Sequence, residues 1–389
     1  MASGFDFEGR LRRIRSLMEE EDVDVLVATR LMSVCYVSGA FIPYRAAAMI
    51  PREGDVELYP SLIESERIRE ESWIKNINPW APIPGLNWTE QVAERIKALG
   101  LEKARIGVES EITPRLIEGV ITHAELSMLQ EKLPDAKFVN ASRVMNEAVV
   151  VKEPAEIERM RKAADIVDAG IKASLKALKV GVTETAVVGA GEKAMRELGS
   201  MWNWPITGGD EISSGYRGGY SRCGCTPPSN KTIKEGEIVM IDLHATYDLY
   251  YSDLSFNVVM GKANQEQRKM IETFVELSYT LLDNVAPGVR IGEVAQKVMD
   301  KLSKTEYAPH TPPVFGHGIG IVGHEWYPPI APFEPWTKYE LKEGMVEELY
   351  LQINKPGVGG LRLEVPVLIT GRGCEKLTKT PIEPAELPV

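Results

Sequence analysis

Two apolar segments, Val239-Met240-Ile241-Asp242-Leu243-His244 and Tyr251-Ser252-Asp253-Leu254, each carry an aspartate inside a pattern typical of a buried β-strand. A two-residue turn at Tyr247-Asp248 would join them as an antiparallel hairpin, in the register that pairs Asp242 directly with Asp253. Directly opposed side chains lie roughly 5 Å apart, so the two charges repel each other unless something positive lies between them. A divalent cation with oxygen ligands meets that need. The alternative is a shifted register that leaves both carboxylates in solvent.

The length and charge of the chain limit the classes of protein to which it can belong. Its 389 residues are too many for one ordinary hydrophobic core, so we expect about two domains. The net charge of −11 argues against nucleic acid or an anionic membrane as the main partner. No stretch approaches the roughly 18 apolar residues of a membrane span, and the first residues show no signal-peptide pattern. The four cysteines form no disulfide or zinc-finger spacing, and a reducing cytoplasm is the expected compartment.

Helical and strand patterns alternate in the first part of the chain. We expect a helix over 5–22, a strand over 24–28, a hairpin from 47–50 and 56–59, a helix over 88–99 and a strand over 105–109. This alternation predicts a small α/β domain over residues 1–150.

A domain boundary is expected near Lys152, because Pro154 suits the first turn of a new helix. From residue 151 to 389, helical patterns and β-rich segments follow one another in runs. The helices are expected over 155–178, 184–198 and 264–285, and the β-rich segments over 236–261, 344–354 and 361–370. Runs of helices with antiparallel hairpins predict an α+β catalytic domain.

Two histidines and a third carboxylate are further candidates for a site. His317 lies in Phe315-Gly316-His317-Gly318-Ile319-Gly320, and His324-Glu325 follows seven residues later. The flanking glycines let the backbone approach a ligand closely. Glu364 alternates with apolar residues in Leu361-Arg362-Leu363-Glu364-Val365, so it needs a partner if the strand is buried. That partner is either a metal ion, which the two aspartates favour, or Arg362 in a simple ion pair.

The ordered set Asp242, Asp253, His317 and Glu364, with the Gly-His-Gly-Ile-Gly segment, resembles the creatinase/prolidase/methionine-aminopeptidase family. The eleven-residue step between the aspartates and the seven-residue step from His317 to His324 agree with the family, and the resemblance covers most of the chain. It implies a C-terminal pita-bread fold of α+β architecture, preceded by the N-terminal domain of creatinases and prolidases. A homodimer is also implied.

The resemblance further implies roles for these residues. Asp242 would hold one metal ion, Asp253 and Glu364 would bridge two, and His317 would complete the other site. His324 would contact the substrate near its scissile carbonyl, which a metal-bound water attacks in the family. Two cations would lower the pKa of that water and stabilise the oxyanion. The implied cofactor is one or two divalent ions of manganese, zinc, iron or cobalt.

The chain departs from the family pattern at one expected metal ligand. Tyr350 stands where the peptidases carry a ligand glutamate, and Tyr350-Leu351-Gln352 replaces their Glu-Pro-Gly. Glu348 would point to the same face of a strand as Tyr350, roughly 7 Å away. Three alternatives follow: Glu348 substitutes for the missing ligand, Tyr350 ligates weakly, or the site holds one ion on Asp253, His317 and Glu364.

Two further departures concern acid–base groups. Cys225 stands seventeen residues before Asp242, where the family usually carries a substrate-binding histidine. Its thiol would be an acid, a nucleophile or only a structural residue, because a thiol cannot reproduce the proton transfer of an imidazole. His244 faces the same way as Asp242 on the strand, where family members have a small residue. It would be an extra ligand, an acid–base group or a packing residue.

Aromatic residues precede the cysteines. Trp202, Trp204, Tyr216, Tyr220 and Arg222 lie close together in the sequence and would line a substrate pocket or belong to the core. Trp204, Tyr220 and Arg222, together with Arg362 and His324, are the candidate substrate-binding residues.

Three functions are therefore expected as alternatives. The first is a metal-dependent hydrolase of Xaa-Pro peptide bonds that acts on a short peptide. The second is a relative that cleaves a C–N or C–S bond in a small molecule, as creatinase, ectoine hydrolase or dimethylsulfoniopropionate lyase does. The third is a non-catalytic protein-binding member, which retention of four ligands disfavours.

Overall fold

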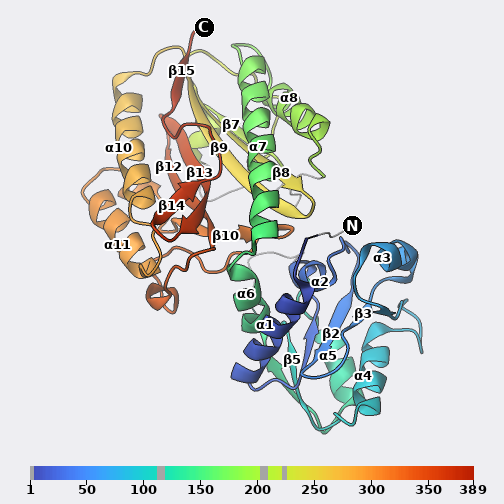
Figure 1. Ribbon diagram of the computed structural model, residues 1–389. Coiled ribbons are helices and arrows are strands. Elements are labelled where there is room, and N and C mark those ends of the chain that lie inside the picture. The colour runs from blue at the N-terminus through green and yellow to red at the C-terminus, as the bar shows by residue number, and fades with distance from the viewer. Residues whose placement is uncertain (1–3, 112–118, 202–208, 221–225) are drawn as a thin grey trace. The chain divides into compact units, whose positions relative to one another are not determined.

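The protein divides into two compact units, Met1–Val149 and Val150–Val389. The computed structural model describes residues 4–111, 119–201, 209–220 and 226–389. Figure 1 shows the helices and strands of each unit. Among the described helices, none combines the length and the apolar character that crossing a bilayer requires.

The first unit is a mixed sheet with helices on it, as its alternating pattern predicts. Its strands are β1 (Val25–Ala28), β2 (Ala47–Pro51), β3 (Glu57–Tyr59), β4 (Asn76–Ile77), β5 (Arg105–Val108) and β6 (Lys137–Asn140), in the order β4-β3-β2-β1-β5-β6. Its helices are α1 (Phe7–Glu20), α2 (Leu31–Ser38), α3 (Ser65–Glu71), α4 (Trp88–Ala98), α5 (His123–Lys132) and α6 (Ser142–Val150), with a 3₁₀ turn at Leu62–Glu64. The expected hairpin of β2 and β3 is confirmed as an antiparallel pair.

The second unit contains two sheets that share no strand. One has the order β15-β9-β8-β7 and the other the order β11-β10-β12-β13-β14. The strands of the first are β7 (Glu211–Ser214), β8 (Ile238–Tyr247), β9 (Tyr250–Met260) and β15 (Ala385–Leu387). Those of the second are β10 (Gly316–Gly320), β11 (Gly323–His324), β12 (Val346–Lys355), β13 (Gly359–Thr370) and β14 (Gly373–Lys376).

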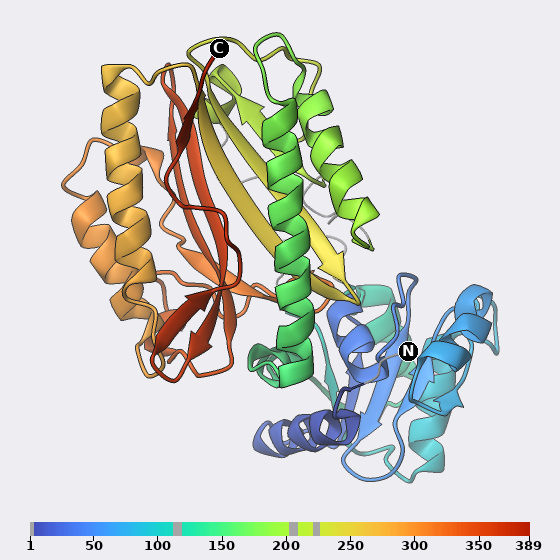
Figure 2. The same cartoon turned by 45° about the horizontal axis from the view of Figure 1, so that its top comes forward.

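Helices cover the outer face of each sheet in this unit. They are α7 (Pro154–Ala177), α8 (Glu184–Glu197), α10 (Gln265–Leu282) and α11 (Ile291–Leu302). The short helix α9 (Tyr216–Tyr220) packs mainly against β13 and β12, and 3₁₀ turns lie at Ala308–His310 and Trp336–Lys338. In the tilted view of Figure 2, α7 and α8 run beside β8 and β9, while α10 and α11 lie on the opposite side of the unit. The helices predicted over 155–178, 184–198 and 264–285 are confirmed, with ends shifted by a few residues.

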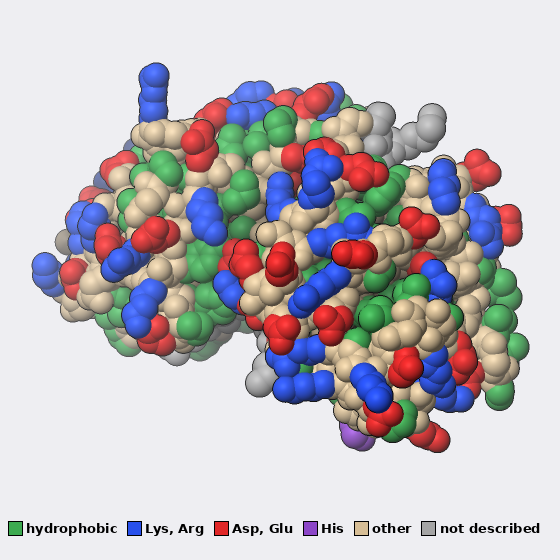
Figure 3. Space-filling model, turned by 60° about the horizontal axis from the view of Figure 1, so that its bottom comes forward, with side chains coloured by type: hydrophobic (Ala, Val, Ile, Leu, Met, Phe, Trp, Pro, Cys, Tyr) green, Lys and Arg blue, Asp and Glu red, His purple; other side chains and the backbone are tan. Residues whose placement is uncertain are grey.

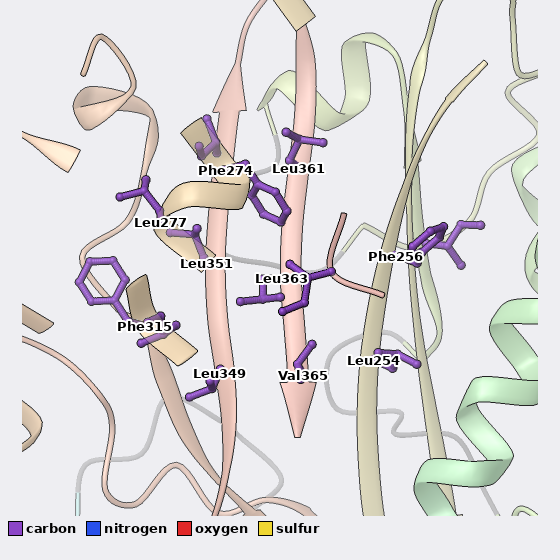
Figure 4. Close-up of a cluster of buried hydrophobic side chains, with 14 of the residues drawn as sticks. Leu254, Phe256, Phe274, Leu277, Phe315, Leu349, Leu351, Leu361, Leu363 and Val365 are labelled. Carbon is purple, nitrogen blue, oxygen red and sulfur yellow. The ribbon is translucent and has the colours of Figure 1, made fainter. Parts of the chain in front are cut away.

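The hydrophobic core takes alternate residues from each long strand. Figure 4 shows Leu349 and Leu351 of β12 beside Leu361, Leu363 and Val365 of β13, next to the side chains of α10. Because side chains alternate along a strand, the residues between these leucines face the other sheet. The expectation that Leu361, Leu363 and Val365 share one face of a buried strand is confirmed.

The predicted register of the β8–β9 hairpin is wrong. The turn is Asp248-Leu249, with φ of 45° and 75°, so that Tyr247 pairs with Tyr250. Two successive positive φ values suit the tight turns that join twisted antiparallel strands. Asp242 therefore lies opposite Ser255, and Asp253 lies opposite His244. The shift preserves the alternation of faces, so both aspartates still point to the same side of the sheet.

Side chains of β9 join the two sheets. Asn257 donates from Nδ2 to the Arg362 carbonyl at 2.7 Å and accepts the Arg362 amide at 2.9 Å. Ser255 donates to the same carbonyl at 2.8 Å and accepts the Glu364 amide at 2.7 Å. Strands β9 and β13 belong to different sheets and share no backbone hydrogen-bond ladder. These four side-chain hydrogen bonds hold β13 against β9 instead.

The face of the protein drawn in Figure 3 is mixed in the sign of its charge. On the face drawn in Figure 3, lysine and arginine side chains are interspersed with aspartates and glutamates. That face therefore has no uniformly positive field that would attract a polyanion such as nucleic acid.

We expect Asn257→Ala to destabilise the protein by about 1–3 kcal/mol, because the buried amide and carbonyl of Arg362 lose a partner. Urea unfolding of the metal-free protein measures the change, and the exposed Asn230→Ala serves as the matched control. Equal stability of the two variants would contradict the idea that Asn257 holds the sheets together.

Candidate metal centre

The predicted site residues converge from four strands. Those on facing sides of the two sheets are Asp242 and His244 of β8, Asp253 of β9, Glu348 and Tyr350 of β12, and Arg362 and Glu364 of β13. All of them are buried. The strand alternation that sends their neighbours into the core sends these polar side chains toward one another.

Asp242, Asp253 and Glu364 form the acidic centre of this group. One ligand oxygen from each lies within 4.8 Å of the others. Oδ1 of Asp242, Oδ1 of Asp253 and Oε2 of Glu364 are buried and receive no hydrogen bond from the described residues. Buried carboxylate oxygens are costly without a partner, and oxygen-rich clusters of this kind suit divalent cations. The donor set therefore fits the metal that the sequence predicts.

The pKa values of this cluster reflect burial and mutual repulsion. Burial, followed by the charge of Asp242, raises the pKa of Asp253 and of Glu364 well above the ordinary range. Burial also works to raise the pKa of Asp242, but Arg362 and His244 outweigh it and the pKa is lowered. Without a cation, Asp242 therefore favours the ionised form, whereas Asp253 and Glu364 favour the protonated form.

Arg362 supplies a fixed positive charge to the centre. Its guanidinium donates to Asp242 at 2.6 Å and to Glu211 of β7 at 2.8 Å, and lies 3.7 Å from Glu364. The strand pairing sets Glu211 directly beside Asp242. Because this guanidinium is buried among acidic side chains, its contacts favour charge neutralisation over the substrate binding for which Arg362 was a candidate.

Glu348 is a further carboxylate near the centre. Neither of its oxygens has a hydrogen-bond partner among the described residues. Burial raises its pKa well above the ordinary value, and the charges of Asp253, Glu364 and Asp242 raise it further. Tyr350 lies opposite Glu364 in the strand pairing, and its hydroxyl donates to Oε1 of Gln352. Glu348 is therefore the better placed of the two to supply a ligand oxygen.

His324 contacts the acidic centre directly, and its expected role in contacting substrate stays a prediction. Its Nε2 lies 2.8 Å from Oδ2 of Asp253 and 3.3 Å from the hydroxyl of Tyr251. The segment that carries it is anchored by a buried ion pair of Glu325 with Lys152, at 2.5 Å.

His317 lies beside His324, with ring centroids 4.6 Å apart, and stacks on Trp326 at 4.3 Å. Among the described residues, two groups of side chains lie close enough together to hold a metal ion, and His317 belongs to neither of them. The strand pairing nevertheless sets His317 opposite Glu348. Its role as a metal ligand stays a prediction.

His244 is held by an acidic residue that the sequence reasoning missed. Oδ1 of Asp210 accepts the His244 backbone amide at 2.7 Å and lies 3.2 Å from Nδ1 of the ring. Burial works to lower the pKa of His244, but Asp210 and Asp242 outweigh it and raise it to about 9.

Not every residue predicted for the site belongs to it, and some residues of the site were not predicted. Trp202, Trp204, Arg222 and Cys225 lie outside the described residues. Tyr220 is on α9 with 68% of its side chain exposed, and Tyr216 is also exposed, so neither belongs to the core. Asp210, Glu211, Tyr251 and Trp326 were not predicted. The acidic pair in Gly209-Asp210-Glu211-Ile212, at the start of β7, was the available signal for the first two.

We expect the metal-free protein to lose stability as the pH rises from about 5 to 8. The pKa of Glu348, ordinarily 4.5, is raised in the folded state, as are those of Asp253 and Glu364. The folded state then binds more protons than the unfolded chain, so stability falls as the pH rises through this window. The raised pKa of His244 acts in the same direction.

Urea unfolding at several pH values after chelator treatment measures this slope. Glu348→Gln should flatten it, whereas Glu235→Gln, an exposed control, should not. A stability that rises between pH 5 and 8 in the unaltered protein would contradict the prediction.

Comparisons with known proteins agree with this arrangement. The profile of metallopeptidase family M24 matches residues 158–371, and that of the creatinase/prolidase N-terminal domain matches residues 10–151. The chain is 27% identical to a Xaa-Pro dipeptidase of Pyrococcus horikoshii, over 95% of this chain and 97% of that protein. It is 28% identical to the Xaa-Pro dipeptidase of Pyrococcus furiosus, over 95% and 98%.

The fold is also that of a solved relative. The crystal structure of the Pyrococcus horikoshii prolidase superposes with a TM-score of 0.81 at 26% identity, covering 96% of this chain and 99% of that one. The two family profiles follow one another in the order that the sequence resemblance implies and together span most of the chain. The chain is therefore a member of metallopeptidase family M24, with a creatinase/prolidase N-terminal domain and the pita-bread fold.

Proposed function

We propose that this protein is a metal-dependent hydrolase of Xaa-Pro peptide bonds that acts on short peptides. The observation that carries the proposal is the buried cluster of Asp242, Asp253 and Glu364, whose free oxygens face one another. Relatives named Xaa-Pro dipeptidase, matched over nearly their whole length, support the substrate class. We also propose that the protein works as a homodimer.

The acidic residues would hold the metal, and the surrounding residues would prepare the site. Asp242, Asp253 and Glu364 supply the ligand oxygens, and Glu348 is the additional carboxylate within reach of their charges. A divalent ion bound there would supply an activated water and polarise the scissile carbonyl. Arg362 pairs with both Glu211 and Asp242, and its positive charge keeps the Asp242 carboxylate ionised for metal binding.

His324 would handle the substrate. Its imidazole is held between Asp253 and Tyr251, so its position is fixed before substrate arrives. An imidazole there would hydrogen-bond the carbonyl oxygen of the substrate or give a proton to the leaving proline nitrogen. Cys225 remains a second candidate for the acid–base role.

Tyr350 favours one alternative function. Its side chain stands where family peptidases carry a ligand glutamate, and its hydroxyl is engaged by Gln352. A change in the ligand set of this kind would suit a member that cleaves a C–N or C–S bond in a small molecule. Absence of hydrolysis on a panel of Xaa-Pro peptides, with activity on such a compound, would establish that alternative.

The primary test is Asp253→Asn. It removes one of three mutually repelling charges, so we expect a folded protein that is at least as stable when metal-free. We expect its rate of Met-Pro hydrolysis to fall at least about a thousandfold, which is about 4 kcal/mol of transition-state stabilisation. Activity is measured on metal-loaded protein, with exposed Asp300→Asn as the matched control. Full activity in Asp253→Asn would rule out the proposed mechanism.

A further inference from the structure

His244 has the hydrogen-bond pattern of a metal-binding histidine. Oδ1 of Asp210 lies 3.2 Å from Nδ1 of the ring and also accepts the backbone amide of the same residue. A carboxylate in that position holds the proton on Nδ1 and leaves the lone pair on Nε2. Histidine ligands in metalloproteins are oriented in this way by a carboxylate behind the ring.

The other ring nitrogen faces the acidic centre. Nε2 of His244 lies 3.3 Å from Oδ1 of Asp253 and 4.0 Å from Oδ2 of Asp242. Despite this proximity, Oδ1 of Asp253 receives no hydrogen bond from the described residues. A nitrogen lone pair and a carboxylate oxygen at this distance repel each other unless a proton or a cation lies between them.

The distance distinguishes these two explanations. A hydrogen bond from an imidazolium to a carboxylate is typically about 2.7–2.9 Å long, and its N–H points at the oxygen. Two ligands of one tetrahedral ion, each bound at about 2.0–2.1 Å, lie about 3.3 Å apart. The contact between His244 and Asp253 has the length of a ligand pair and lacks the geometry of a hydrogen bond.

A second imidazole reaches the same carboxylate from another strand. Nε2 of His324 lies 2.8 Å from Oδ2 of Asp253. The ligand atoms of His244, Asp253 and His324 all lie within 4.8 Å of one another. At 2.8 Å this second contact has the length of a hydrogen bond, which leaves His324 free for the substrate role proposed above, whereas His244 and Asp253 are spaced as two ligands of one ion.

We propose that His244 joins Asp253 as a ligand of the metal, so that the centre has a mixed nitrogen–oxygen ligand set and binds zinc, iron or cobalt more strongly relative to manganese than its carboxylates alone would. The inference rests on the proposed function, since it names the metal preference of the same site. It goes beyond the ligands implied by the family resemblance, which include His317 but not His244. Asp210 is a positioning residue, because it acts through the ring of His244.

The preference follows from the chemistry of the donors. Imidazole nitrogen suits zinc, iron, copper and nickel, whereas carboxylate and water oxygen suit magnesium, calcium and manganese. The oxygen set of Asp242, Asp253 and Glu364 by itself suits manganese and has no donor that specifically favours zinc. Each imidazole that binds the ion adds to the affinity for zinc more than to that for manganese.

Competition between zinc and manganese for chelator-stripped full-length protein tests this proposal. We expect His244→Ala to lower the zinc affinity at least about 10–100-fold, and Asp210→Asn to lower it by an amount in that range. His244→Asp restores an oxygen donor, so it should keep manganese binding while narrowing the ratio of zinc affinity to manganese affinity. His123→Ala, which alters an exposed histidine of the first unit, is the matched control and should leave both affinities unchanged.

X-ray absorption spectroscopy of the zinc-loaded, unaltered protein gives an independent reading that needs no variant to fold. At least one imidazole per ion in the unaltered protein, and one fewer in His244→Ala or His244→Asp, is the expected result. The same imidazole count and the same zinc affinity in those variants would overturn the proposal.

Failure of this inference can be separated from failure of the proposed function. Hydrolysis of Met-Pro by a centre whose imidazole count does not depend on His244 would overturn the ligand proposal alone. Confirmed ligation by His244, in a protein that hydrolyses no Xaa-Pro peptide, would overturn the peptidase proposal alone.

Discussion

The burial of like charges between two sheets is the constraint on which the second unit depends. Asp242, Asp253 and Glu364 face one another out of contact with water, and Glu348 adds its charge nearby. The cost of such a cluster is met only if positive charge or protons accompany it. Arg362, and in the metal-free protein also His244, provide part of that charge. A divalent ion is the remaining contribution that the free oxygens indicate, so folding and metal binding are coupled.

The architecture serves to hold these charges together. Each long strand sends one face into an apolar core, which stabilises the sheet, and the other face toward the opposite sheet (Figure 4). Asn257 and Ser255 then fix the backbone of β13 at Arg362 and Glu364. Behind the ligands, Asp210 and Glu211 orient His244 and Arg362 from the end of β7. The centre is thus prepared by strands, whose positions vary less than those of loops.

Local patterns predicted much of this arrangement. The alternation of Leu361, Leu363 and Val365 with charged residues correctly identified a buried strand with a polar face, and Pro154 identified the start of α7. Short buried elements were harder. Helix α2 carries the mostly apolar segment Leu31-Met32-Ser33-Val34, which fits a buried strand as well as a buried helix.

The register of the β8–β9 hairpin and the partners of the ligands needed the structure. Asp248 and Leu249 adopt positive φ in the turn, and a leucine gives no sign of that in sequence. The wrong register had opposed Asp242 to Asp253, but alternation kept both on one face. Asp210 is distant in sequence from the strand that it supports, so its link to His244 arises only from tertiary structure.

The claim at the centre of this account is that the buried carboxylates bind metal. Elemental mass spectrometry of protein purified without chelators measures this most directly, together with reloading of stripped protein with manganese, zinc, iron and cobalt. The account predicts at least one divalent ion per chain, removed by chelator and regained on reloading. A folded protein that contains no ion and takes up none of the four metals would contradict it.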